Sequence, residues 1–308
     1  MKYCNPIIVS CVVVLMSACT EERRETPTKG QTTVVVAESV SPVIQQEKLK
    51  FEELYPQAKV GLQVASDREA IARLFNDSIS IIVSSRPLNK EEREVAKRFK
   101  LALGEFKVAI DGIAIIVNNE NPMTQLRTTQ LDSILSGSAK EWKSAGWKQS
   151  TSSVALCLPD RNTGTFEVIA EKILQGKQFT NPAKIVSSSA EIIEFVSQHE
   201  NALGMVGVNW FVDNKNKVKA LELTDPNAPD SLGIKGKYYG PYQAYIYQKF
   251  YPLTKDVYIY SRADNYGVAA GFTSFMTSSA GQKIILNSGL VPATMPVRLV
   301  EITNRSIQ

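Results

Sequence analysis

Short apolar runs alternate with amphipathic stretches along most of this 308-residue chain, and no other feature limits its fold as strongly. The runs at 59–64, 79–83 and 113–117 have the length and composition of buried strands. Between them, 66–75 and 90–101 carry apolar residues at helical spacing. This βαβα order predicts an α/β fold in which helices cover both faces of a parallel or mixed sheet.

The same alternation continues to the end of the chain. Helix starts are marked by Ser41-Pro42 and by a capping-box pattern from Ser66 to Glu69. Further helices are expected at 41–55, 129–135, 163–174, 189–198, 268–277 and 281–286, and further strands at 33–36, 154–158, 203–207, 243–247, 257–260 and 297–302.

The N-terminus has the features of an export signal. Lys2 precedes the mostly apolar segment 6–18, which has the length of a signal-peptide core and is short for a membrane span. The segment 15–19 (LMSAC) resembles a bacterial lipobox, which implies cleavage before Cys19 and acylation of that cysteine. We therefore expect a signal peptide at 1–18 and a lipidated tether at 19–32, and a protein anchored to a membrane in the periplasm or at the cell surface. The alternative is an ordinary signal peptide that is cleaved nearby without lipidation.

The charge and the cysteine content argue against a nucleic-acid-binding protein and against a domain held by disulfides. The 35 Lys and Arg residues against 31 Asp and Glu residues give a net charge of +4, and the basic residues are scattered, which disfavours nucleic-acid binding. Cys157 is the one cysteine of the expected mature domain, so no disulfide within that domain is expected. Its apolar, strand-like surroundings predict a buried structural thiol.

The usual signatures of catalysis are missing from the sequence. His199 is the only histidine and follows an amphipathic helix, where a solvated helix end is the simplest interpretation. One histidine without a cysteine pair offers no basis for a metal site. The sequence contains no G-x-S-x-G, G-x-x-x-x-G-K-[ST] or G-x-G-x-x-G motif. We therefore expect a binding protein without a metal or cofactor rather than an enzyme.

Four polar segments follow predicted strands where helices begin: 38–41 (ESVS), 65–67 (ASD), 84–87 (SSRP) and 160–165 (DRNTGT). Ligands of open α/β sheets bind beyond the carboxyl ends of the strands, and the N–H groups that open a helix favour an anion. Hydroxyl side chains add donors, and the guanidinium groups of Arg86 and Arg161 match oxyanion geometry. Ser66 and Thr163 also serve as helix caps, so each segment alone is weak evidence. Together they predict a site for a small oxyanion.

Several motifs follow one another in a distinctive order along residues 33–302. They are 84–88 (SSRPL), 111–118 (DGIAIIVN), 131–137 (LDSILSG) with Trp142, 161–165 (RNTGT), 202–206 (ALGMV), and Gly281-Gln282 with 289–292 (GLVP). In this order they resemble the phosphate-binding proteins of ABC-type phosphate importers, a branch of the type II periplasmic binding fold. The resemblance implies an α/β protein of two lobes with mixed sheets and a hinge.

The resemblance also implies particular ligand-binding residues. Ser39 and Val40 match the first ligand loop of the family, Ser66 matches the second, and Thr163, Gly164 and Thr165 match its S-G-T motif. Ser84 matches the serine of the S-D-x-P motif, but Ser85 replaces the aspartate that accepts the proton of hydrogen phosphate and repels sulfate. Arg86 beside it is expected to add positive charge. The loop before Thr163 is two residues shorter than in the family, which puts in doubt whether Arg161 reaches the place of the family's arginine.

The implied architecture has lobe one at 33–112 and 248–308 and lobe two at 113–242, joined by hinge strands near 112–118 and 243–247. The implied function is a monomeric lipoprotein that captures inorganic phosphate between the lobes and delivers it to an ABC permease in the inner membrane. Two alternatives stay open. One is a binder of another oxyanion such as sulfate or molybdate, and the other is a sensory or scaffolding lipoprotein that keeps the fold without transport.

Overall fold

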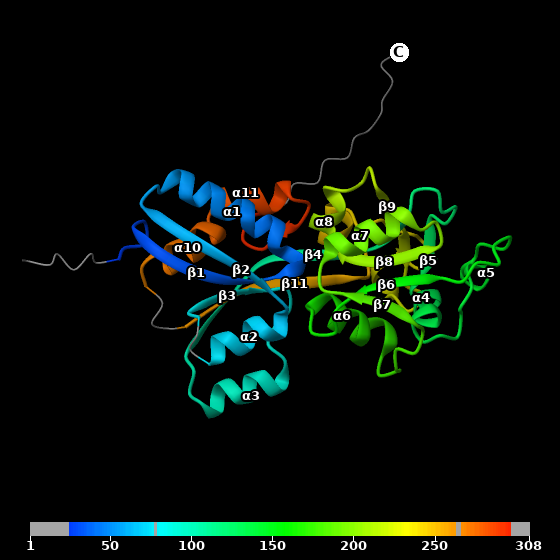
Figure 1. The fold of residues 1–308 in the computed structure, drawn as a ribbon, viewed down its shortest axis with the longest axis horizontal. Coiled ribbons are helices and arrows are strands. Elements are labelled where there is room, and N and C mark those ends of the chain that lie inside the picture. Colours follow the sequence, from blue (N-terminus) through cyan, green and yellow to red (C-terminus); the bar gives the residue numbers. More distant parts are fainter. Residues whose placement is uncertain (1–24, 77–78, 263–265, 297–308) are drawn as a thin grey trace, which may run out of the picture.

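The computed structural model describes residues 25–76, 79–262 and 266–296. It confirms the predicted α/β class, because parallel and antiparallel strands form one mixed sheet with helices on its faces (Figure 1). The sheet order is β2-β1-β3-β11-β4-β8-β6-β7, and β9 and β12 also pair with β4. Cys19 and the predicted signal peptide lie outside the described residues, as does the strand expected at 297–302.

One half of the molecule, called the first half below, contains the N-terminal strands. Its strands are β1 (Gly30–Ala37), β2 (Ala58–Ala65), β3 (Ile81–Ser84), β11 (Thr254–Arg262), β12 (Val291–Pro292) and the first part of β4 (Leu103–Asn118). Its helices are η1 (Glu38–Val40), α1 (Ser41–Leu54), α2 (Asp67–Phe75), α3 (Lys90–Arg98), α10 (Val268–Thr277) and α11 (Ser279–Asn287).

The second half contains the middle of the chain. Its strands are β5 (Gln125–Arg127), β6 (Ala155–Pro159), β7 (Ala183–Val186), β8 (Ala202–Gly207), β9 (Val218–Ala220), β10 (Glu222–Thr224) and the last part of β4. Its helices are α4 (Thr128–Leu135), α5 (Trp142–Ala145), α6 (Gly164–Ile169) continued by η2 (Ala170–Leu174), α7 (Ser189–Gln198), α8 (Val208–Val212), η3 (Asp230–Leu232) and α9 (Gln243–Tyr247).

Strand β4 connects the two halves. Its residues 103–112 pair with β11, and its residues 113–117 pair with β8. The strand has 16 residues and is far longer than the run predicted at 113–117. Its first part (LGEFKVAI) mixes charged and apolar residues, so it does not have the continuous apolar pattern from which the strand was predicted. Figure 1 shows β4 and β11 running between the two groups of helices. The backbone N–H of Ile113 donates to Leu253, where the returning chain enters β11.

The prediction of a hinge strand at 243–247 is wrong, because these residues form helix α9. The buried side chain of this segment is Ile246, and Tyr247 is exposed. The backbone N–H of Ile246 donates to Tyr242, which starts the helix. The chain returns to the first half through residues 248–253 instead.

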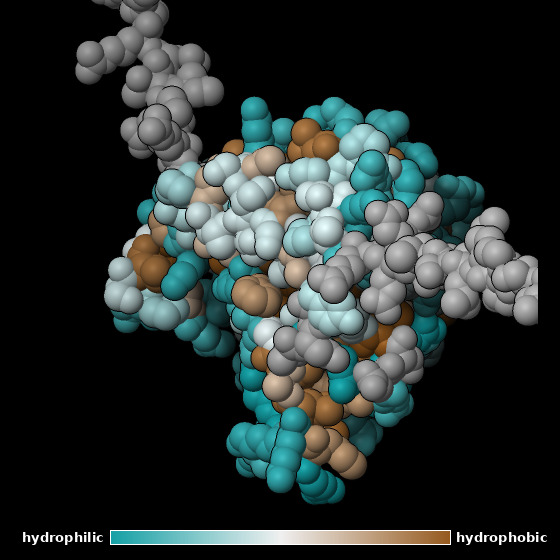
Figure 2. Space-filling view, turned by 90° about the vertical axis from the view of Figure 1, so that its left-hand side faces the viewer, coloured by the Kyte–Doolittle hydropathy of each residue, from teal (hydrophilic) through white to brown (hydrophobic). Residues whose placement is uncertain are grey.

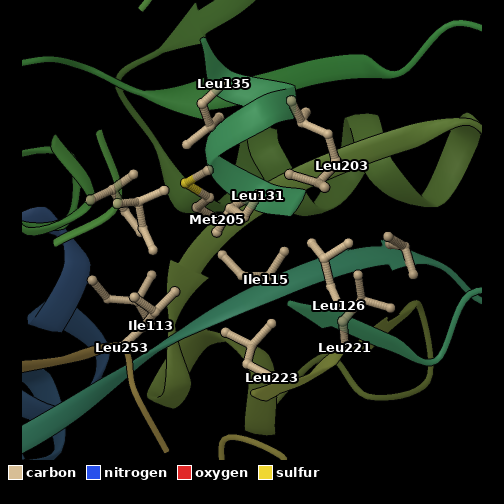
Figure 3. Close-up of a cluster of buried hydrophobic side chains, with 14 of the residues drawn as sticks. Ile113, Ile115, Leu126, Leu131, Leu135, Leu203, Met205, Leu221, Leu223 and Leu253 are labelled. Carbon is tan, nitrogen blue, oxygen red and sulfur yellow. The ribbon is translucent and has the colours of Figure 1, made fainter. Parts of the chain in front are cut away.

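Each half has hydrophobic clusters of its own. In the second half, apolar side chains of β4, β5, β8, β10 and α4 meet in one buried cluster (Figure 3). Ile113 and Ile115 of β4 and Leu203 and Met205 of β8 belong to it. In the first half, Val34 and Val36 of β1 pack with residues of α1, α10 and β11. Burying such side chains stabilises a fold by about 1.5–3 kcal/mol each.

The surface is that of an ordinary folded domain. Figure 2 faces the end of the first half, where apolar residues reach the surface in separate patches among hydrophilic ones. Exposed apolar residues of this kind are common on folded proteins and do not by themselves indicate a binding surface. Within the described ranges, no helix has both the length and the apolar character needed to cross a membrane.

Candidate functional site

Two sets of three parallel strands, one in each half, direct their carboxyl ends toward the junction between the halves. In the first half, β1 pairs in parallel with β2 and β3, and in the second half β6 pairs in parallel with β7 and β8. Residues that follow these strands contact one another across the junction, as the bonds below show. This is where open α/β sheets bind their ligands.

The carboxylate of Asp67 lies at the centre of this junction and is 1% exposed. Its Oδ1 accepts from the backbone N–H of Ser85 at 2.6 Å and from the hydroxyl of Ser84 at 2.9 Å. Its Oδ2 accepts from the backbone N–H of Gly164 at 2.6 Å and from the hydroxyl of Ser85 at 3.1 Å. The two bonds from backbone N–H groups are short, as expected for hydrogen bonds to a carboxylate. We call these four groups of Ser84, Ser85 and Gly164 the donor cluster.

The local sequence explains how the donor cluster forms. Ser84 is the last residue of the buried strand β3. The next residue, Ser85, is also fully buried. Gly164 is the first residue of α6, and the Thr163 hydroxyl accepts from Phe166 to cap that helix. Ser66 caps α2 in the same way, by accepting from Glu69, and this bond confirms the predicted cap. The cap also fixes the start of the helix that presents Asp67.

The structure therefore brings together three of the site residues expected from sequence, namely Ser84, Ser85 and Gly164. Thr165 lies next to them, is 2% exposed, and its hydroxyl is buried without a hydrogen-bond partner. Ser66 and Thr163 act as helix caps.

Other expected residues contact different groups. The Ser39 hydroxyl accepts from Lys255 at 2.8 Å, and Val40 packs in the core of the first half. The Arg161 side chain is exposed.

The guanidinium group of Arg86 does not add free positive charge. Its two terminal nitrogens both donate to Glu92 at 2.7 Å, and its Nε lies 2.7 Å from Glu167. Burial raises the pKa of Glu167, which Arg86 partly offsets. The pKa of Glu92 is lowered. Burial alone would raise this pKa, but the hydrogen bonds from Arg86 and Asn89 lower it by more. The expectation that Arg86 adds charge at the ligand is therefore wrong, because two carboxylates hold its donors.

A second carboxylate crosses the junction from the first half. Glu38 accepts from the backbone N–H and the hydroxyl of Ser189, both at 2.8 Å, at the start of α7. Burial raises the pKa of Glu38, and the bonds from Ser189 act in the opposite direction. The side chains of Asn209 and Trp210 donate to the carbonyl oxygens of Ser39 and Glu38. The halves are thus joined by hydrogen bonds on both sides of the donor cluster.

A pocket of about 540 Å³ opens beside these contacts. It is lined by residues of both halves, which include Ser41, Ser66, Thr163, Ser188 and Trp210. The lining also includes the acidic residues Glu38, Glu69 and Asp160 and the apolar residues Val64 and Ala65, so hydroxyl, carboxylate and apolar groups share it. Within the described residues, no cluster of three or more His, Cys, Asp or Glu side chains is placed to hold a metal ion.

The sequence analysis missed Asp67 and Glu38 as functional residues, although both lie within its polar segments. Two other expectations are confirmed. Cys157 is buried in a hydrophobic cluster, and burial raises its pKa to about 11. His199 lies exposed at the end of α7 opposite to Ser189.

Gly164 is a position where closure of the junction requires the absence of a side chain. A Cβ there would lie 2.5 Å from the Ser85 hydroxyl oxygen and 3.0 Å from the Ser85 carbonyl oxygen. We expect Gly164→Ala to push the halves apart and to raise the radius of gyration in small-angle X-ray scattering. Gly61→Ala is the matched control, because its Cβ would make only ordinary contacts in β2. An unchanged radius in Gly164→Ala would show that the halves do not meet there in solution.

Comparisons with known proteins agree with this architecture. Residues 21–280 match the family model of the PBP superfamily domain. A phosphate-binding protein PstS of Staphylococcus aureus is 26% identical over 233 residues, which cover 75% of this chain and 68% of the relative.

Two solved structures are similar over 85% of this chain, each at 22% identity. One is a phosphate ABC transporter substrate-binding protein with bound phosphate from Clostridium perfringens, with a TM-score of 0.73 and 99% of its chain covered. The other is an ABC-type phosphate transport receptor from Vibrio cholerae, with a TM-score of 0.65 and its whole chain covered. Because the family model covers well over half of the sequence, the chain belongs to the PBP superfamily.

Proposed function

We propose that this protein is a solute-binding component that captures phosphate at the junction of its halves and delivers it to an ABC permease. The observation that carries the proposal is the donor cluster, which already holds an anionic group between the carboxyl ends of the strands. The names of the relatives support phosphate as the solute and an ABC importer as the partner. The protein acts by binding and release rather than as an enzyme.

The chemistry of the junction favours a protonated oxyanion. Its N–H and O–H groups are neutral, and the nearby guanidinium of Arg86 is paired with two carboxylates. The carboxylate of Asp67 also lies among these groups. A carboxylate near the site repels doubly charged sulfate more strongly than singly charged dihydrogen phosphate.

The two halves correspond to the two lobes in this proposal. Lobe one comprises 33–112 and 248–308 and lobe two 113–242, with β4 and the segment 248–253 as the connections. Rotation about these connections opens and closes the junction. We also propose that acyl chains on Cys19 hold a monomeric protein at a membrane, which the lipobox-like segment 15–19 supports.

The test is calorimetric titration of the purified protein, freed of bound solute by unfolding and refolding, with phosphate, sulfate and molybdate. We expect saturable binding of one phosphate per chain and weaker binding of sulfate. A stronger response to sulfate or molybdate would assign a different oxyanion to the same site. A folded sample that binds none of the three anions would contradict the proposal.

A further inference from the structure

The donor cluster is occupied by the protein itself. We propose that the carboxylate of Asp67 is a built-in occupant of the anion site, which locks the halves together without solute and which an oxyanion must displace. This inference rests on the proposed function for the identity of the solute. The lock between the halves does not depend on that identity.

The hydrogen bonds leave no donor of the cluster free. Each oxygen of Asp67 lies within hydrogen-bond distance of two donors. The single hydrogen of the Ser84 hydroxyl is shared, because this hydroxyl also lies 2.9 Å from the carbonyl oxygen of Arg86. The N–H groups of Ser85 and Gly164 each have a single hydrogen, and both point to Asp67 at 2.6 Å. A solute oxyanion therefore cannot bind these groups until the carboxylate leaves them.

Asp67 also connects the halves in the way that a trapped solute would. It belongs to α2 in the first half, whereas Gly164 belongs to α6 in the second. The backbone N–H of its neighbour Arg68 donates to Asn162 of the second half at 3.2 Å. Glu38 makes an equivalent bond from the first half to Ser189. Two carboxylates of one half thus satisfy helix-opening N–H groups of the other half, and closure needs no solute.

Such an internal competitor lowers the apparent affinity for solute. The apparent dissociation constant equals the intrinsic one divided by the fraction of molecules in which the site is free. A lock that is closed in about 90–99% of molecules weakens binding about 10- to 100-fold. Removal of the carboxylate should therefore strengthen the binding of phosphate and open the protein when solute is absent.

Three versions of the purified protein test this: wild type, Asp67→Ala and Asp67→Asn. The control is Glu91→Ala, which removes an exposed carboxylate from the first turn of the neighbouring helix α3. Without solute, we expect a larger radius of gyration by small-angle X-ray scattering for the Asp67 variants than for wild type and Glu91→Ala. In calorimetry, we expect phosphate to bind the Asp67 variants about 10- to 100-fold more tightly. Acetate should close Asp67→Ala, because it restores the missing carboxylate, and should leave wild type unchanged.

The outcomes separate the inference from the proposed function. If wild type and the Asp67 variants bind phosphate equally, the function stands and Asp67 is not a competitor. If the variants lose the phosphate binding that wild type shows, Asp67 contacts the solute as a ligand and the inference is wrong. If no version binds phosphate, sulfate or molybdate, the function fails. In that case an open Asp67→Ala that acetate closes still supports the lock, and an unchanged radius overturns it.

Discussion

Lys255→Met should lower the free energy of unfolding by about 3–5 kcal/mol, because it leaves a buried carboxylate without its partner. Lys255 and Asp111 face each other on β11 and β4, with Nζ 3.1 Å from Oδ2 and both side chains fully buried. The Lys255 Nζ also donates to Ser39, and Asp111 accepts from the backbone N–H of Val208. The pair therefore joins segments of both halves at the point where β4 passes between them.

The measurement is urea denaturation of wild type, Lys255→Met and the double variant with Asp111→Asn. The double variant should recover much of the loss, since it removes the unpaired charge and keeps an acceptor for Val208. Burial raises the pKa of Asp111, so protonation should make the loss smaller near pH 5 than near pH 8. Lys107→Met is the control on the same two strands: its pair with Asp256 is about one-third exposed and should be worth less than ~1 kcal/mol. A loss no larger than the control's would contradict the argument.

Much of the fold could be predicted because many of its strands and helices have local sequence signals, such as apolar runs and helix caps. Strand β3 is a continuous apolar run, and Ser66 caps α2 as its residue type predicts. The exceptions depend on distant contacts. Residues 243–247 form a helix because Ile246 packs beside Gly112 of β4, a neighbour more than 100 positions away. The outer part of β4 is a strand because β11 pairs with it from the other end of the chain.

The residues of the donor cluster were named from the sequence, but the carboxylate that accepts from them was not. Ser84, Ser85 and Gly164 were found because hydroxyl and glycine residues after strands indicate an anion site. Asp67 was missed because its role depends on Gly164, which lies 97 positions away and across the junction. The pairing of Arg86 was also missed: Glu92, six positions away, accepts from both terminal nitrogens, and Glu167 of the second half lies beside Nε. Sequence patterns show which groups can bind an anion, and they do not show which of the chain's own charges reach those groups first.

Glu47→Met should stabilise the protein, and the gain should grow as the pH rises. Glu47 of α1 is 0% exposed, and neither of its carboxyl oxygens has a hydrogen-bond partner. Burial raises its pKa from 4.5 to about 9, so the folded protein holds this group protonated at neutral pH. Above the pKa that Glu47 has in the unfolded chain, the unfolded state releases this proton and the folded state keeps it. The free energy of unfolding then falls by about 1.4 kcal/mol per pH unit until the pH reaches the pKa of Glu47 in the folded protein. Stability is therefore lost between about pH 4.5 and pH 9.

Methionine has a similar shape, carries no proton, and fits a site that lies among apolar residues of α1 and beside the start of α11. We expect a gain of less than ~1 kcal/mol near pH 5 and a gain larger by about 4 kcal/mol near pH 8, measured by urea denaturation at both values. Glu53→Met on the same helix is the control, because Glu53 is exposed and its ion pair with Lys50 is exposed too, so its effect should be small at both pH values. A gain from Glu47→Met that does not change with pH would show that the folded protein does not hold this carboxyl protonated, and that packing alone explains the difference.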